Sequence, residues 1–206
     1  MGAELKCRVR FGKQVSEGRA LLETSELIFR GDFRLNIPFA HMKSVQAADG
    51  ELRLDFPEGQ ATFALGPQAE KWAHKILHPK TRLEKLGIKT GAKVSVLGAL
   101  EKAFACELAQ ITKAVTHGKV AADAAWIFLS AESPKDLAQA AKMAEGLKGA
   151  TALWIVYPKG RKDITENDVL AAGRHAGLKD VKVVGFSPTH TALKFVVPLS
   201  ARTKTG

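Results

Sequence analysis

The sequence has few of the residues that build disulfide frameworks or zinc sites. Among its 206 residues are only two cysteines, Cys7 and Cys106, which lie far apart without a CxxC pair or neighbouring histidines. This spacing excludes a disulfide-rich scaffold and a finger-type zinc site. We therefore expect a protein of a reducing compartment, the cytoplasm.

Long apolar runs are also missing. No unbroken apolar stretch approaches the roughly 20 residues of a membrane helix. The first residues carry Glu4 and Lys6 instead of an apolar stretch behind a basic cluster, so we expect no secretory signal. An apolar fraction of 46% and a charged fraction of 25% are typical of globular domains. The sequence therefore predicts a soluble chain without a transmembrane segment.

Acidic residues are outnumbered by basic ones, 21 to 31, for a net charge of +10. Residues 1–80 hold 12 basic and 10 acidic residues, net +2, whereas residues 81–206 hold 19 and 11, net +8. The excess favours an anionic small molecule or an acidic protein as partner. Nucleic acid has weaker support, because no aromatic residues for base stacking interleave the densest basic cluster.

The first 66 residues alternate apolar and polar side chains in short runs separated by turns. This pattern predicts seven antiparallel strands with one wet face. In the first run Lys6, Arg8 and Arg10 share a face, opposite the apolar residues between them. Pro67 then opens an amphipathic helix that contains Trp72.

Seven strands closed by a helix with a central tryptophan resemble a pleckstrin-homology-like domain of the GRAM type, over residues 4–78. The resemblance implies a bent barrel plugged by the helix, with Trp72 in its core. In some members of that family, basic residues around the first hairpin bind inositol phosphates. The residues in comparable places here are Lys6, Arg8, Arg10, Lys13 and Arg19.

Residues 79–90 are polar and proline-marked, which predicts a linker after a first domain of residues 1–78. From residue 91 to 198, short apolar strands alternate with helices and end in two strands close in sequence. This order predicts a small three-layer α/β (Rossmann-like) sheet with a terminal β-hairpin whose last strand is antiparallel. One helix is expected from Ser133 through Leu147. The apolar run from Ala152 to Tyr157 predicts a strand covered on both faces, with the Trp154 indole N–H bonded to a backbone group. Residues 199–206 are expected to be a polar tail. The fold class is thus a two-domain α+β chain.

Motifs that bind cofactors or metals are missing from the second domain. Gly98 follows the first strand without the GxGxxG spacing, and no GxxxxGK[ST] occurs. Ser130 lies outside a GxSxG motif. His74 and His78 are one helical turn apart, but a third metal ligand is lacking. We therefore expect neither a cofactor nor a metal, and the sequence identifies no catalytic residue.

Two further resemblances cover the second domain. Residues 86–98 look like the first strand and entry loop of S-adenosylmethionine-dependent methyltransferases, but Ser95 or Val96 replaces the usual acid and the loop has one glycine. The run from Ala152 to Gly160, with Asp163 and a GLKDVKV segment after it, resembles an uncharacterised bacterial family with an LWxxxPKG signature. No cofactor or catalytic residue comes with that second resemblance.

Basic residues recur in the loops expected at the carboxyl edge of the sheet, where α/β folds bind ligands. We predict that they form an anion-attracting site there: Lys159, Arg161, Lys162, Lys119 and His190. The absence of catalytic motifs favours a noncatalytic binding or adaptor protein. The alternative is a group-transfer enzyme with a degenerate methyltransferase-like fold.

Overall fold

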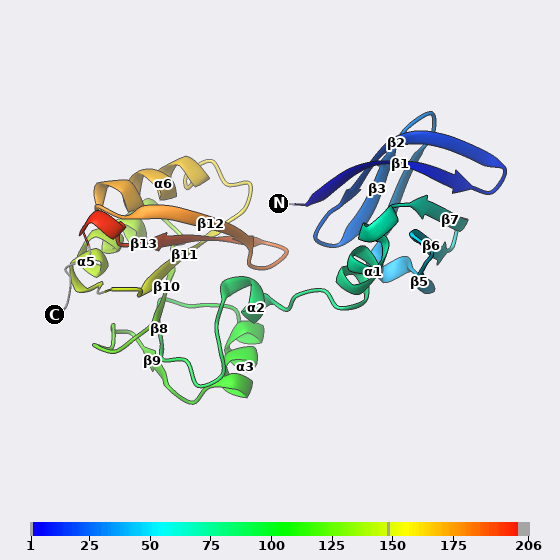
Figure 1. The fold of residues 1–206 in the computed structure, drawn as a ribbon. Helices are drawn as coiled ribbons and strands as arrows, with labels where there is room; N and C mark the ends of the chain where they lie inside the picture. The colour runs from blue at the N-terminus through cyan, green and yellow to red at the C-terminus, as the bar shows by residue number, and fades with distance from the viewer. Residues whose placement is uncertain (1, 148, 202–206) are drawn as a thin grey trace. The chain divides into compact units, whose positions relative to one another are not determined.

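The computed structural model describes residues 2–147 and 149–201. The chain divides into two compact units, the first ending at Lys80 and the second beginning at Thr81 (Figure 1). None of the helices in the described parts is long and apolar enough to cross a membrane. The two units are described separately.

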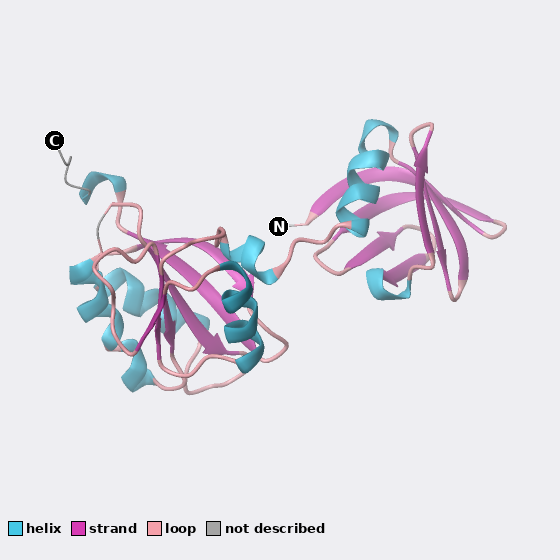
Figure 2. Cartoon of the chain, turned by 90° about the horizontal axis from the view of Figure 1, so that it is seen from below, coloured by secondary structure: helices cyan, strands magenta, loops and turns pink. Residues whose placement is uncertain are grey.

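The first unit is a curled sheet of seven antiparallel strands with a helix packed on it (Figure 2). The strand order is β4-β3-β2-β1-β7-β6-β5, so β4 and β5 are the free edges and the sheet is a half-barrel. The strands are β1 (Ala3–Phe11), β2 (Gln14–Leu22), β3 (Glu26–Arg30), β4 (Arg34–Pro38), β5 (Ser44–Ala48), β6 (Glu51–Phe56) and β7 (Gly59–Ala64). The helix is α1 (Ala69–Leu77), and short 3-10 turns lie at Phe39–His41 and Gly66–Gln68.

The core of the first unit lies on one face of this sheet. Phe29 and Phe63 meet there edge to face at 6.2 Å between ring centroids, and Leu52 is fully buried beside them. Helix α1 adds Trp72, which is 2% exposed. The seven strands and the closing helix confirm the predictions made from alternation and spacing. Trp72 lies in the core, as the resemblance implied.

The second unit is a six-stranded mixed sheet in the order β12-β13-β11-β10-β8-β9. Its strands are β8 (Val94–Leu97), β9 (Val115–His117), β10 (Trp126–Ser130), β11 (Ala152–Pro158), β12 (Lys179–Gly185) and β13 (His190–Val196). Strands β8 to β11 run parallel, and β13 is antiparallel to both β11 and β12. The predicted parallel sheet with a terminal hairpin is confirmed.

Helices cover both faces of this sheet, so the unit has three layers (Figure 2). They are α2 (Arg82–Leu86), α3 (Lys102–Ile111), α4 (Pro134–Leu137), α5 (Gln139–Gly146) and α6 (Glu166–His175). Phe128 and Trp154 pack on the side of α2 and α3, whereas Leu153 and Ile155 pack on the side of α4 to α6. A strand buried on both faces explains why β11 is a continuous apolar run.

Four details differ from the sequence predictions. The expected linker over 79–90 contains α2, started by a capping box between Thr81 and Glu84, and Leu86 is buried in the second unit. One expected helix is split at Ala138 into α4 and α5. The Trp154 indole N–H, expected to bond a backbone group, has no hydrogen-bond partner among the described residues. Within the expected polar tail, Leu199–Ala201 forms a 3-10 turn and residues 202–206 lie outside the described residues.

Candidate functional site at the carboxyl edge of the second sheet

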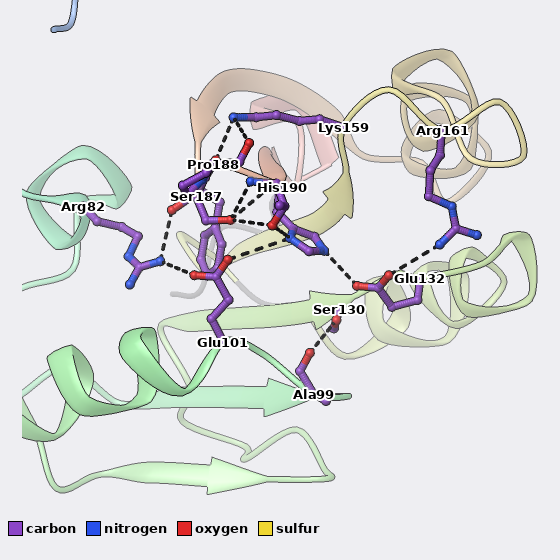
Figure 3. Close-up of polar contacts among 12 residues, drawn as sticks. Arg82, Ala99, Glu101, Ser130, Glu132, Lys159, Arg161, Ser187, Pro188 and His190 are labelled. Carbon is purple, nitrogen blue, oxygen red and sulfur yellow. Dashed lines mark hydrogen bonds and ion pairs between the residues drawn. The ribbon is translucent and has the colours of Figure 1, made fainter.

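Five loops meet at one edge of the second sheet. The parallel strands β8, β9, β10 and β11 end there, and the β12–β13 turn lies there because β13 starts opposite the end of β11, with His190 paired to Pro158. This is the edge at which open α/β sheets bind ligands. Figure 3 shows the polar side chains that these loops bring together.

Arg82 ties three elements of the second unit together. Its guanidinium makes a two-point contact with Glu107, with Nε–Oε2 at 3.0 Å and Nη2–Oε1 at 2.7 Å. Nη1 donates to Glu101 Oε2 at 3.0 Å and to the Phe186 carbonyl at 3.1 Å. The same group lies over the Phe104 ring at 5.2 Å and the Phe186 ring at 4.9 Å. Although burial lowers the pKa of Arg82, hydrogen bonds to the two carboxylates outweigh it and the pKa is raised.

A chain of polar contacts between acidic and basic side chains continues from Glu101 along the edge (Figure 3). Partial burial raises the pKa of Glu101, but hydrogen bonds from Ser187 and Arg82 outweigh burial and the pKa is lowered. His190 Nδ1 lies 3.8 Å from Glu101 Oε1, and His190 Nε2 lies 2.9 Å from Glu132 Oε1. Arg161 contacts Glu132 at 3.7 Å.

The predicted anion-binding residues are divided between different contacts. Arg161 and His190 share Glu132, and Arg161 also forms a bidentate pair with Asp163. Lys159 points instead to the β12–β13 turn, where Nζ donates to the Ser187 carbonyl at 2.7 Å (Figure 3). Lys119 and Lys162 are exposed on the loops after β9 and β11.

The sequence reasoning missed the partners of these cations. Arg82 lies in the range expected to be a linker, and no role was predicted for Glu101 or Glu107. The capping-box spacing from Thr81 to Glu84 was a usable signal for α2. The ion pairs themselves join residues 19 and 25 positions apart, which no local pattern reveals.

The crevice between β8 and β10, where the strand order reverses, is closed by protein atoms. Gly98 has φ +79°, and a Cβ placed on it would lie 3.0 Å from Ser130 Cβ. The Ser130 hydroxyl donates to the Ala99 carbonyl at 2.8 Å. Because glycine is needed for this close approach, the loop after β8 packs on β10 instead of forming a phosphate cradle.

A pocket of about 650 Å³ lies beside this closed crevice, between α3 and the strands β8 and β9. Val96, Leu100, Phe104 and Leu108 are among the apolar residues that line it. Its polar and charged lining comprises Thr112, Lys113 and His117. The Thr112 hydroxyl already donates to the Ala92 carbonyl at 2.7 Å. The volume is within the range of small-molecule sites.

No group of three His, Cys, Asp or Glu side chains that could hold a metal ion occurs in the described residues. The His74 and His78 rings are neighbours, 4.7 Å apart between centroids. They lie at the end of α1, in the first unit.

No family model matches the chain, so neither the GRAM resemblance nor the LWxxxPKG resemblance gains support. No curated protein matches either. Among solved structures, the chain is similar to a TehB-like SAM-dependent methyltransferase from Corynebacterium glutamicum (TM-score 0.38, 13% identity, 63% of this chain and 96% of that one). It is also similar to a protein-(glutamine-N5) methyltransferase from Alicyclobacillus acidocaldarius (TM-score 0.32, 16% identity, 59% and 96%). These neighbours are methyltransferase-like Rossmann folds at weak TM-scores, and they carry no argument about function.

Proposed function

We propose that the chain is a noncatalytic binding protein whose second unit takes a small anionic molecule with an apolar body. The observation that carries the proposal is the pocket beside α3, which combines apolar walls with Lys113 and His117. An apolar lining with a few charged groups is the usual composition of a ligand site. Lys119, two residues after His117 in the chain, adds a further cation to this end of the sheet.

The chain of ion pairs at the edge supports binding rather than catalysis. A general acid or base must reach a proton on the substrate, but Glu101 and Glu132 are both engaged by cations, and Glu132 is held by His190 as well as Arg161. Ser130 is held by the Ala99 carbonyl. These contacts stabilise the loops at the carboxyl edge of the sheet.

A size-matched pair of variants tests this proposal. Ala109, an exposed residue of α3, lines the pocket, whereas Ala103 is exposed on the same helix and outside the lining. In a thermal-shift screen of aromatic and medium-chain carboxylates, a ligand at 100 times its Kd adds about 2.7 kcal/mol of stability. Ala109→Phe should abolish the shift and Ala103→Phe should preserve it. The absence of any shift with the unmodified chain, or equal loss in both variants, would refute the proposal.

The charge requirement is tested separately with Lys113. Lys113→Gln should weaken binding of a carboxylate about tenfold, since a charge-assisted hydrogen bond contributes roughly 1.5 kcal/mol. It should leave binding of the corresponding primary amide unchanged. Lys102→Gln, which removes the same charge from the start of α3 outside the pocket, is the matched control.

The alternative of a group-transfer enzyme gains one favourable observation, the strand order with an antiparallel β13. Two contacts stand against S-adenosylmethionine as its cofactor. Ser95 and Val96, the two candidates for the position of the expected acid, are both buried, and Ser95 accepts a hydrogen bond from the Ala121 N–H at 3.0 Å. Gly98 is packed against Ser130. Calorimetry should detect no micromolar binding of S-adenosylmethionine, and such binding would restore the enzyme alternative.

A further inference from the structure

Four basic residues form a continuous row across the outer face of the first unit. The register pairs Lys6 with Arg19, Arg19 with Arg30, and Arg30 with Arg34, on strands β1 to β4. Directly opposed residues in a sheet share a face, so all four side chains lie on one side. We call this set, Lys6, Arg19, Arg30 and Arg34, the basic row.

The basic row is on the side of the sheet that faces away from the core. Cys7, Ala20, Phe29 and Leu35, each adjacent in the chain to a member of the row, are buried in the core. Successive residues of a strand point to opposite faces, which directs the row outward. All four members are exposed, and the Arg19 side chain is 73% exposed.

The arrangement is unfavourable for folding. Like charges directly opposite each other on neighbouring strands destabilise a sheet, and here three such pairs follow one another. One acid relieves part of the repulsion, because Glu4 contacts Arg19 at 3.2 Å. A row that costs stability and lies on an exposed surface has the character of a binding site for negative charge.

The geometry favours a linear polyanion. Neighbouring strands are about 4.8 Å apart, so the row extends over about 14 Å. Two acids flank the row on the same face of the sheet. Glu4, two residues before Lys6 in β1, lies on one side of the row. Glu17, two residues before Arg19 in β2, lies on the other side and contacts Arg8 at 3.7 Å. A flat layer of anionic lipid would press these carboxylates against charges of the same sign. A line of phosphates can follow the row between them.

We propose that the basic row binds the sugar–phosphate backbone of a nucleic acid duplex, which carries one negative charge per about 1.7 Å of its axis. The net charge of +10 for the whole chain also favours a polyanion. Phosphate contacts position a protein without reading bases. The expected binding is therefore independent of sequence and strongly dependent on salt.

The test uses the full chain and a fluorescein-labelled 20-base-pair DNA duplex, followed by anisotropy at increasing KCl concentration. The variant Arg30→Gln with Arg34→Gln should weaken binding at least tenfold at low salt. Because each phosphate contact contributes about −0.9 to the slope of log K against log salt, loss of two contacts should make the slope less negative by about 1.8. Two duplexes of unrelated sequence should behave alike.

The matched control changes Lys71→Gln with Lys75→Gln, two exposed residues of α1 whose loss reduces the net charge equally. It should change the affinity less than twofold. An equal effect of both double changes would overturn the proposal, since net charge alone would then explain binding. The proposal would also fail if the unmodified chain did not bind the duplex at low salt. Binding of phosphatidylserine-containing vesicles through the row would then assign the row to a membrane surface.

Discussion

The two units hold their basic residues in opposite ways. In the first, Lys6, Arg19, Arg30 and Arg34 face one another across four strands. In the second, basic side chains and carboxylates alternate along the carboxyl edge. The unit with the smaller net charge therefore presents the larger uninterrupted row of cations. The pairing of neighbouring side chains decides which charges are available to a partner. The net charge of a unit does not show where those charges are.

The largest effect is expected from substitution of Arg82, which pairs with two carboxylates in the second unit. Arg82→Met keeps an unbranched side chain between Phe104 and Phe186 but leaves Glu101 and Glu107 without their main cation. Removing one partner of a buried pair costs about 3 kcal/mol or more, and because the Glu101 and Glu107 side chains are 31% and 38% exposed, we expect about 2 kcal/mol here. Urea unfolding of the second unit should show a loss of that size.

The control for Arg82 is an exposed ion pair of the same unit. Lys93 contacts Asp123, and their side chains are 56% and 62% exposed. Lys93→Met should therefore cost less than about 1 kcal/mol. Similar losses for the two substitutions would show that the Arg82 contacts add nothing beyond those of a surface pair.

An effect of intermediate size is expected on the stability of the second unit at low pH, where Glu101 becomes protonated. Its pKa in the folded chain lies below the ordinary value of 4.5. A carboxyl with a lowered pKa stabilises the folded state above its ordinary pKa, and this contribution is lost as the pH falls through the folded value. Hydrogen exchange in peptides of the second unit should therefore accelerate as the pH falls below about 4.5, after correction for intrinsic rates. Glu101→Gln should weaken this dependence, and an unchanged pH profile would contradict it.

The smallest effect is expected in the basic row of the first unit, where removal of one of the like charges should increase stability. Arg30 has Arg19 on one side and Arg34 on the other, and threonine suits a strand. Arg30→Thr should stabilise the first unit by about 0.5 kcal/mol at low salt. The gain should shrink in 1 M salt, where charges are screened within about 3 Å. A loss of stability at low salt would show that the row is not repulsive.

Sequence patterns predicted the sheets and their faces because both depend on local periodicity. The alternation around Lys6, Arg8 and Arg10 placed them on one face, and the apolar run from Ala152 to Tyr157 indicated a strand covered on both sides. The basic row, in contrast, can be recognised only when the register between neighbouring strands is known. That register depends on turn lengths and on which face of each strand is buried, so alternation within one strand could not reveal it.

The sequence predicted which loops lie at the carboxyl edge, but it did not predict which side chains contact one another there. Lys159, Arg161 and His190 were expected there because their loops follow β11 or join β12 to β13, and the structure puts those loops at that edge. Their partners come from distant positions, such as Glu132, 58 residues from His190. Which carboxylate pairs with which basic side chain follows from tertiary packing, so a cluster that the sequence predicts as basic also contains the acids Glu101, Glu132 and Asp163.

The capping box of α2 begins at Thr81 and so ends the exposed segment in which a protease can cut between the two units. His78, Pro79 and Lys80 are exposed between the end of α1 and Thr81. Two residues beyond Lys80, Arg82 is held by two carboxylates and two aromatic rings, its side chain 14% exposed. Trypsin therefore has an open bond after Lys80 and a shielded one after Arg82. Cleavage at the first bond would release two fragments that each retain a complete core, whereas a fragment beginning at residue 91 would lose the helix that neutralises Glu101 and Glu107.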